Sequence, residues 1–350
     1  MLFSTKQIYF LQAQGVIRSL IYFFIPVSVF VFSWAFNEYV ADSLRQDPIN
    51  VRFLEQSIDC KKVAAQIYLS IALSFAVGFF CVVTSIYTII ALGNRFDLFR
   101  TGLSVTFFLL GSVPVLLLAV LLAHIAPGFH KSIYLAFQPV YDCVLTACSG
   151  GWKDLYLMNA EKLSLVIMPA AVLLAIGSST VALRFPQDDG NEQGTIEDIR
   201  RKLRSLNIFL FLGTMILILS LLEMSAWNRL PIPFLEAKSG TDFREYLFNS
   251  HFFFGILFSA CLACVYVPPA FRLEDEIRAL AIFEITGIKK STEATPSKRV
   301  VVTEEDISSW INKNGFSFGL TQRMWQVAAI LAPVATGPIA TVMTQLTRAG

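Results

Sequence analysis

Charged side chains are scarce in this sequence. Only 15% of its 350 residues are Asp, Glu, Lys or Arg, whereas a soluble domain usually carries about a quarter. The formal net charge is +2, which is too small to indicate a nucleic-acid partner, and no nucleic-acid motif occurs. Hydrophobic residues make up 55% of the chain. This composition argues against a soluble globular domain and favours a protein whose main partner is the lipid bilayer.

Residues and motifs that carry catalysis are also rare. The chain has three histidines, and it contains no H-E-x-x-H, G-x-x-x-x-G-K-[ST] or G-x-S-x-G motif. Cys261 and Cys264 form a C-x-x-C pair, but a zinc site needs four ligands and no second pair accompanies them. We therefore expect no enzymatic activity, no metal site and no bound cofactor.

Six apolar runs are long enough to cross a bilayer, whose hydrocarbon layer of ~30 Å needs about 20 helical residues. The only formal charges inside these runs are Glu38 and Glu223, each near the end of its run. Backbone polar groups in lipid must be satisfied within the segment, so such runs predict helices. The sequence thus predicts an all-α polytopic integral membrane protein. Its spans are 19–39, 63–93, 101–127, 163–183, 206–227 and 250–268.

The predicted spans belong to a transmembrane domain, residues 1–270, which is followed by a C-terminal region, residues 271–350. Pro268 and Pro269 are expected to end or kink the sixth helix, because proline lacks the N–H that a helix interior needs. The C-terminal region is predicted to be small, mainly helical, cytoplasmic and regulatory.

Two further segments are predicted within the C-terminal region. Thr303 and the acidic residues after it predict the start of a helix that includes Trp310 and ends at Asn314-Gly315. The apolar segment 325–346 contains two prolines and a glycine. It is therefore either a seventh span or a broken, re-entrant pair of half-helices that packs against protein.

Basic residues near the span ends predict the orientation. The densest cluster, Arg200, Arg201, Lys202 and Arg204, precedes the fifth span and favours a cytoplasmic location for 184–205. Both termini then lie in the cytoplasm, and we expect a multi-pass protein of the inner cell membrane. Thr195 and Asp198 form a capping pattern, which predicts a helix that begins at Thr195 and runs into the fifth span.

The same orientation places three cysteines, Cys60, Cys143 and Cys148, outside the cytoplasm. One disulfide among them would leave one thiol over, and three reduced cysteines fit the sequence equally well. The stretch 133–145 is apolar and aromatic, which predicts a helix that lies at the membrane surface.

Small and polar residues recur along one face of the second span at helical spacing. They are Gln66, Ser70, Ser74, Gly78, Cys81, Ser85 and Thr88. One interpretation is a water-facing stripe that lines a pore, with Gln66, Ser70, Ser74, Ser85 and Thr88 as its polar members. The alternative is close helix packing, because small residues let helices approach and hydroxyls bond across the contact.

Other charged residues suggest further roles in such a protein. Glu38 and Glu223 share the outer side of the predicted topology and could form a cation-attracting vestibule. Arg200, Arg201 and Arg204, together with the segment around Trp310, are the candidate gating residues.

The favoured hypothesis is a homo-oligomeric membrane channel or pore for ion transport, gated by a cytoplasmic ligand or partner protein. A membrane-depolarising effector of bacterial antiviral defence fits this outline. The alternatives are a secondary transporter, which would show internal repeats that this sequence lacks, and a non-catalytic membrane anchor or assembly protein. The sequence specifies neither the ion, nor the gating signal, nor the subunit count.

Overall fold

Nearly all of the described chain is α-helical, as the sequence predicts. The structure is a computed structural model that describes Ser28 and residues 60–96, 138–148, 152–181, 192–235, 237–292, 302–316 and 320–346. These residues form α2 (Cys60–Phe96), α5 (Gln138–Ala147), α6 (Trp152–Val181), α7 (Glu192–Asn228), α8 (Ala237–Thr292), α9 (Glu304–Lys313) and α10 (Leu320–Leu346), with a short 3-10 helix, η2 (Ile232–Phe234). They contain no strand. The predicted spans 19–39, apart from Ser28, and 101–127 lie outside them, as does Glu38.

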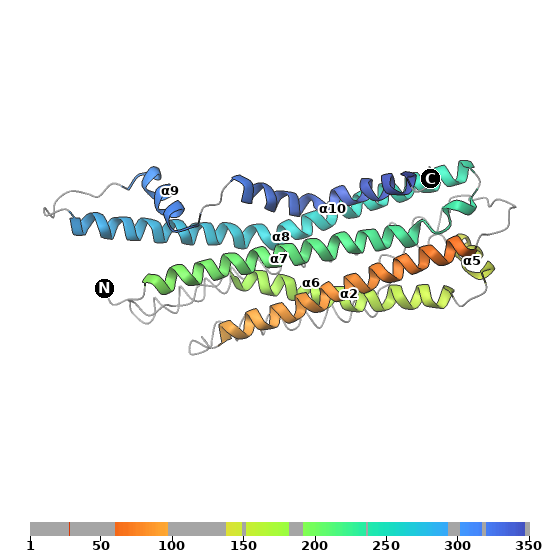
Figure 1. Cartoon of the computed structure of the whole chain (residues 1–350), viewed down its shortest axis with the longest axis horizontal. Coiled ribbons are helices and arrows are strands. Elements are labelled where there is room, and N and C mark those ends of the chain that lie inside the picture. The colour runs from red at the N-terminus through yellow and green to blue at the C-terminus, as the bar shows by residue number, and fades with distance from the viewer. Residues whose placement is uncertain are drawn as a thin grey trace.

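The long helices lie side by side along the longest axis of the molecule (Figure 1). α7 packs against α2, α6, α8 and α10, and α10 also packs along α8. α2, α6 and α8 run in one direction, and α7 and α10 run in the opposite one (Figure 1). One end of the bundle, which we call the disulfide end, holds α5 and the start of α2. The other end, which we call the α9 end, holds α9 and the start of α7.

Three described helical stretches are long and apolar enough to cross a bilayer, namely Cys60–Leu92, Ile196–Phe234 and Gly240–Gly287. A shorter apolar stretch, Pro169–Val181, lies in α6. The chain thus has the helices of a membrane protein. The predicted spans at 206–227 and 250–268 fall within two of the long stretches, and the span at 63–93 coincides with the first stretch up to Leu92. The full count of six spans stays a prediction.

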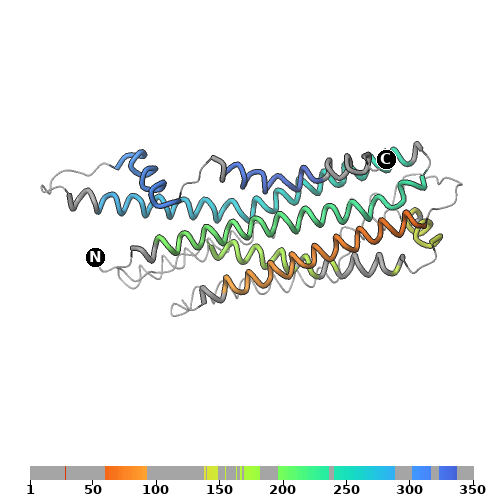
Figure 2. The backbone as a smooth tube through the Cα atoms, viewed as in Figure 1, coloured from red at the N-terminus to blue at the C-terminus, as the bar shows by residue number. Residues whose placement is uncertain are grey.

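Two helices extend beyond their predicted boundaries; of the predicted end or kink at Pro268 and Pro269, the end does not occur. α8 does not end at Pro268 and Pro269 but continues through them over 56 residues, and its tube is unbroken in Figure 2. Leu262, Tyr266, Leu273 and Ile277 flank the prolines and are all buried in one cluster with residues of α7. Burial on both sides of the prolines outweighs the two missing N–H groups. α7 begins at Glu192, so Thr195 lies inside the helix instead of capping it.

α10 is one helix of 27 residues, so of the two alternatives for 325–346 the broken pair of half-helices is wrong, and a seventh crossing stays a prediction. It packs on α8 and α7, which compensates for the helix-breaking tendency of Pro333. The contact with α8 is close at Gly255, where an added Cβ would lie 2.7 Å from the carbonyl oxygen of Pro333 and 3.0 Å from Cα of Val334.

A Gly255→Ala substitution should therefore destabilise the packing of α8 on α10. Both clashing atoms belong to the backbone of α10, so relief requires a helix shift, and we expect a loss of about 1–3 kcal/mol. The measurement is thermal unfolding of the purified protein in detergent. Gly287→Ala, in the same helix, is the control, because no described atom lies within 4 Å of its added Cβ. That control should match or exceed the stability of the parent protein.

A disulfide closes one end of the bundle. Cys60, the first residue of α2, is bonded to Cys148, which follows α5, with their Cα atoms 5.4 Å apart. Cys143 is exposed and has a free thiol. Of the two cysteine states that the sequence allows, the structure has one disulfide with one thiol left over. The predicted surface helix at 133–145 corresponds in part to α5, which buries Tyr141, among others, against the end of α7.

Candidate functional sites: the polar face of α2 and the α9 junction

The polar face of α2 packs against α7 within the same chain. Ser70 and Thr88 have no exposed surface, and Ser74 is 7% exposed. The side-chain amide of Gln66 donates a hydrogen bond to the carbonyl oxygen of Ala226 in α7 at 3.0 Å. Ser85 is half-buried, and its hydroxyl donates to the carbonyl oxygen of Cys81 at 2.9 Å. The face thus makes the close helix contact that the sequence offered as the alternative to a pore lining, and its role as a pore lining stays a prediction.

Glu223 of α7 meets this face at Ser74. The oxygen atoms Ser74 Oγ and Glu223 Oε1 lie 3.1 Å apart, although the two residues are 149 positions apart in the chain. The Glu223 side chain has no exposed surface. The structure therefore places Glu223 inside the helix contact, whereas a vestibule would need it at an exposed mouth. Its proposed companion Glu38 lies outside the described residues.

The opposite face of α2 carries large apolar side chains that the described chain leaves uncovered. Phe75 is 77% exposed, and the others with similar exposure are Tyr68, Leu69, Phe79, Val82, Ile86, Ile89 and Ile90. They extend along most of the helix. In a bilayer such a face contacts lipid or a neighbouring copy of the chain.

α9 docks on α8 at the opposite end of the bundle from the disulfide. Its start follows the prediction closely, since Thr303 caps the helix and Asp306 completes the capping box. Its end also agrees, because Asn314 is the C-cap and Gly315 has a positive φ of 72°. Ile307 and Trp310 are buried in the cluster that contains Ile277, Ala281 and Ile285 of α8.

Two of the predicted gating residues, Arg200 and Trp310, come together at this junction. Arg200 Nη2 donates to the carbonyl oxygen of Asn314 at 2.6 Å, and the Arg200 guanidinium lies 5.7 Å from the centre of the Phe316 ring. Phe316 in turn stacks on Trp310, whose indole nitrogen donates to Glu284 Oε2 of α8 at 3.3 Å. Residues of α7, α8 and the α9 segment thus meet in one contact.

The other two predicted gating residues, Arg201 and Arg204, are not part of that contact. Both are exposed, and the structure gives them no partner among the described residues. Arg201 points 100° away from Arg200 around α7, whereas Arg204 lies on nearly the same face but about 6 Å further along the helix.

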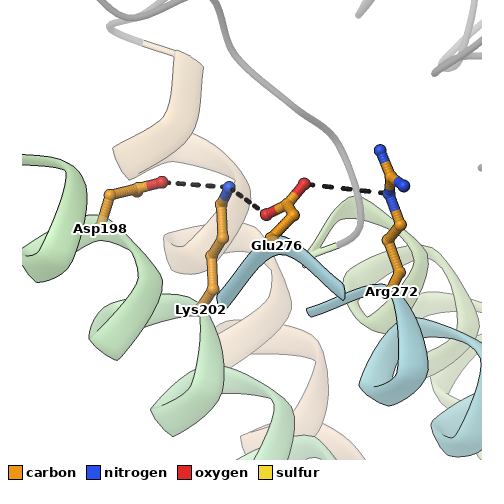
Figure 3. A network of polar contacts seen from close by, with 4 residues as sticks. All are labelled: Asp198, Lys202, Arg272 and Glu276. Carbon is orange, nitrogen blue, oxygen red and sulfur yellow. Dashed lines mark hydrogen bonds and ion pairs between the residues drawn. The ribbon is translucent and has the colours of Figure 1, made fainter. Parts of the chain in front are cut away.

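A network of four charged residues, two of them buried, lies in the same part of the bundle (Figure 3). Lys202 of α7 lies 3.1 Å from Asp198 and 3.5 Å from Glu276 of α8, and Glu276 lies 3.9 Å from Arg272. Lys202 is 5% exposed and Glu276 is 7% exposed. Sequence reasoning missed Glu276 because nothing in the pattern of α8 marks it as buried. The network joins α7 to α8 beside residues of the α9 junction, since Lys202 is two positions after Arg200 and Glu276 precedes Ile277.

A neutral polar contact joins three helices a short way along the bundle. Asn207 Oδ1 of α7 accepts hydrogen bonds from the Tyr266 hydroxyl of α8 and from the Gln326 amide of α10, each at 3.2 Å. Sequence reasoning missed these three residues as well. The available signal was a lone Asn at the start of an apolar run.

Comparison with protein-family models, with curated proteins and with solved structures finds no match for this chain. Within the described ranges, no group of three or more His, Cys, Asp or Glu residues could hold a metal ion.

Proposed function

We propose that the protein is a homo-oligomeric ion channel of the inner membrane whose opening is controlled by the docking of α9. The observation that carries this proposal is the junction of Arg200, Trp310 and Phe316. It lies on α7 and α8, and both helices continue from it without a break into the apolar stretches. A change at α9 can therefore be transmitted along α7 and α8 to their apolar parts.

In the proposed mechanism, the packed arrangement of α2 and α7 is the closed state. α7 covers the hydroxyl groups of Ser70 and Ser74, so water cannot reach them. Undocking of α9 removes one of the contacts that hold α7 against the C-terminal part of α8, beside the Lys202–Glu276 pair. α7 then moves relative to α2, and the polar face lines a water-filled path. A path lined by hydroxyl groups conducts ions without a ring of fixed charges.

The exposed apolar face of α2 supports assembly from several copies within the bilayer. A ligand or partner protein that competes with α9 for its docking site on α8 would act as the opening signal. The resulting flux would depolarise the cell, which is the action expected of a membrane effector in antiviral defence.

The test is ion flux in liposomes that contain the purified protein. Trp310→Ala removes the largest buried side chain of α9 and should raise the resting flux at least tenfold, which corresponds to ~1.4 kcal/mol of lost docking energy. Arg200→Ala should act in the same direction. Arg201→Ala and Arg204→Ala are the matched controls, because both residues are exposed neighbours on the same helix. Equal flux from all four variants would contradict control by α9.

A second comparison addresses the conducting path. Ser70→Leu and Ser74→Leu should reduce the flux of the Trp310→Ala protein, whereas a substitution on the lipid-side face, Phe79→Leu, should leave it unchanged. A protein truncated after Pro269 would not test α9 alone, because the truncation also removes the last part of α8, including Glu276. Absence of flux from every variant, with insertion confirmed, would contradict the channel and favour a transporter or an anchor.

A further inference from the structure

The charge-free parts of three helices end at about the same level of the bundle. α7, α8 and α10 lie side by side (Figure 1), and Asn207 of α7 contacts both Tyr266 of α8 and Gln326 of α10. These three positions therefore mark one level along the bundle. The first charged residues beyond it, towards the α9 end, are three arginines, one on each helix. They are Arg204 on α7, Arg272 on α8 and Arg323 on α10.

In the opposite direction the same helices carry no Asp, Glu, Lys or Arg over long distances. α7 has none before Glu223, α8 has none before Glu245, and α10 has none up to Leu346. At 1.5 Å per residue each charge-free stretch is about 28 Å or longer, which matches the ~30 Å hydrocarbon layer of a bilayer. Trp325 of α10 lies at the level of the three arginines and is 61% exposed, and tryptophan is enriched where membrane helices meet water. A bilayer that covers these stretches therefore ends, on the α9 side, at the level of the arginines.

Arg201 and Arg204 lie at this level on an outward face of α7. Both are exposed, and the described chain provides neither with a partner. The same face continues through Ile208, which is half-buried, to Phe211, which is 46% exposed, because spacings of three, four and three residues keep side chains on one side of a helix. In a bilayer the exposed ring of Phe211 lies among lipid chains. The two guanidinium groups on the same face then lie at the depth of the lipid headgroups.

Few neighbouring groups on α7 compete for these two arginines. Asp198 lies 3.1 Å from Lys202, and Arg200 donates to the carbonyl oxygen of Asn314. Glu197 is exposed on the same face as Arg201, but it lies one turn, or about 6 Å, farther from the apolar part of the helix. The outward face of α7 thus carries a net positive charge next to its apolar part.

We propose that Arg201 and Arg204 bind the phosphate group of an anionic phospholipid. A guanidinium group donates two parallel hydrogen bonds to phosphate oxygens, and basic residues beside a membrane helix attract anionic lipids. The chains of the bound lipid lie along Ile208 and Phe211. The site is separate from the docking contact of α9 and does not depend on ion conduction. In liposomes of phosphatidylcholine alone, Arg201→Ala and Arg204→Ala therefore remain controls for α9 docking.

Native mass spectrometry of the protein in a non-ionic detergent tests the proposal. The probe is phosphatidylglycerol, and phosphatidylcholine with the same chains is the neutral comparison. Arg201→Gln and Arg204→Gln should each weaken the binding of phosphatidylglycerol about fivefold, the usual contribution of one basic residue at an anionic membrane surface, and should leave the binding of phosphatidylcholine unchanged. The matched control is Arg278→Gln/Lys313→Gln, which removes two exposed positive charges away from the apolar stretches and should bind both lipids as the parent does.

Equal affinity of the parent protein and of Arg201→Gln/Arg204→Gln for phosphatidylglycerol would overturn the proposal. Displacement of the lipid by an equal concentration of inorganic phosphate would also overturn it, because the site would then recognise a soluble anion. The same spectra report the subunit count. Loss of subunits in the double variant, with unchanged lipid binding, would assign this face of α7 to a neighbouring copy of the chain.

Thermal unfolding separates lost binding from lost folding. Without added lipid, the melting temperature of Arg201→Gln/Arg204→Gln should equal that of the parent, because both side chains are exposed. Phosphatidylglycerol should raise the melting temperature of the parent and of Arg278→Gln/Lys313→Gln, since a ligand that binds the folded state stabilises it. The same rise in Arg201→Gln/Arg204→Gln would contradict a site at these two arginines.

Discussion

Replacing Cys148 by serine should cause a large loss of stability, about 2–5 kcal/mol, the range typical for removal of a native disulfide. The bond joins residues separated by 88 positions, and cross-links that close long loops restrict the unfolded chain most. It also ties the start of α2 to the end of α5. The measurement is thermal unfolding in detergent, with and without a thiol reductant.

Cys143→Ser is the matched control for this experiment, because Cys143 lies in α5, five positions before Cys148, and has a free, exposed thiol. Its melting temperature should equal that of the parent protein, and a reductant should lower both equally. If Cys148→Ser melted at the parent temperature and reductant had no effect, the disulfide would contribute nothing to the fold.

A comparable loss is expected at the other end of the bundle on replacement of Lys202 by methionine. This change removes the cation that lies 3.5 Å from Glu276 and leaves a buried carboxylate with Arg272 at 3.9 Å. Removing one partner of a buried ion pair typically costs about 3–5 kcal/mol. The double variant Lys202→Met/Glu276→Leu should recover most of that loss, since no buried charge is left without its counterpart.

The exposed ion pair of Arg323 with Glu274 offers the matched comparison. Its nitrogen and oxygen atoms are 3.1 Å apart, but the Arg323 side chain is 57% exposed, so water screens the pair. Arg323→Met should therefore cost less than about 1 kcal/mol. Equal losses for Lys202→Met and Arg323→Met would show that burial does not strengthen the Lys202 network.

The helices of this protein follow from local patterns, as do both limits of α9, whereas the limits of α7 and α8 do not. Uninterrupted apolar runs predict α2 and the membrane parts of α7 and α8 because a long apolar helix satisfies its own backbone. The capping residues Thr303 and Asp306 predict the start of α9, because their side chains satisfy backbone N–H groups that have no partner within the helix. The continuation of α8 through two prolines depends on packing against α7, which no local pattern reveals.

In the candidate sites, too, local patterns select the residues but do not predict which residues meet. Sequence reasoning selected Arg200 and Trp310 for charge and size, but their meeting joins residues about 110 positions apart and requires the whole antiparallel arrangement of α7 and α8. The spacing on α2 identified a polar face without indicating what covers it. The contact of Ser74 with Glu223 shows that α7 covers this face. That contact depends on the register between α2 and α7, which no local pattern specifies.

The two adjacent prolines create a point at which α8 can bend, with a long helical segment on either side. Pro268 and Pro269 lie near the middle of the helix and cannot donate to the carbonyl groups one turn earlier, so bending is easiest at that point. The arm towards α9 is roughly 35 Å long at 1.5 Å per residue, and a bend of ~10° would move its tip by roughly 6 Å. A spin label at each end of α8 and one beside the joint would therefore report any bending as unequal changes in the two arms.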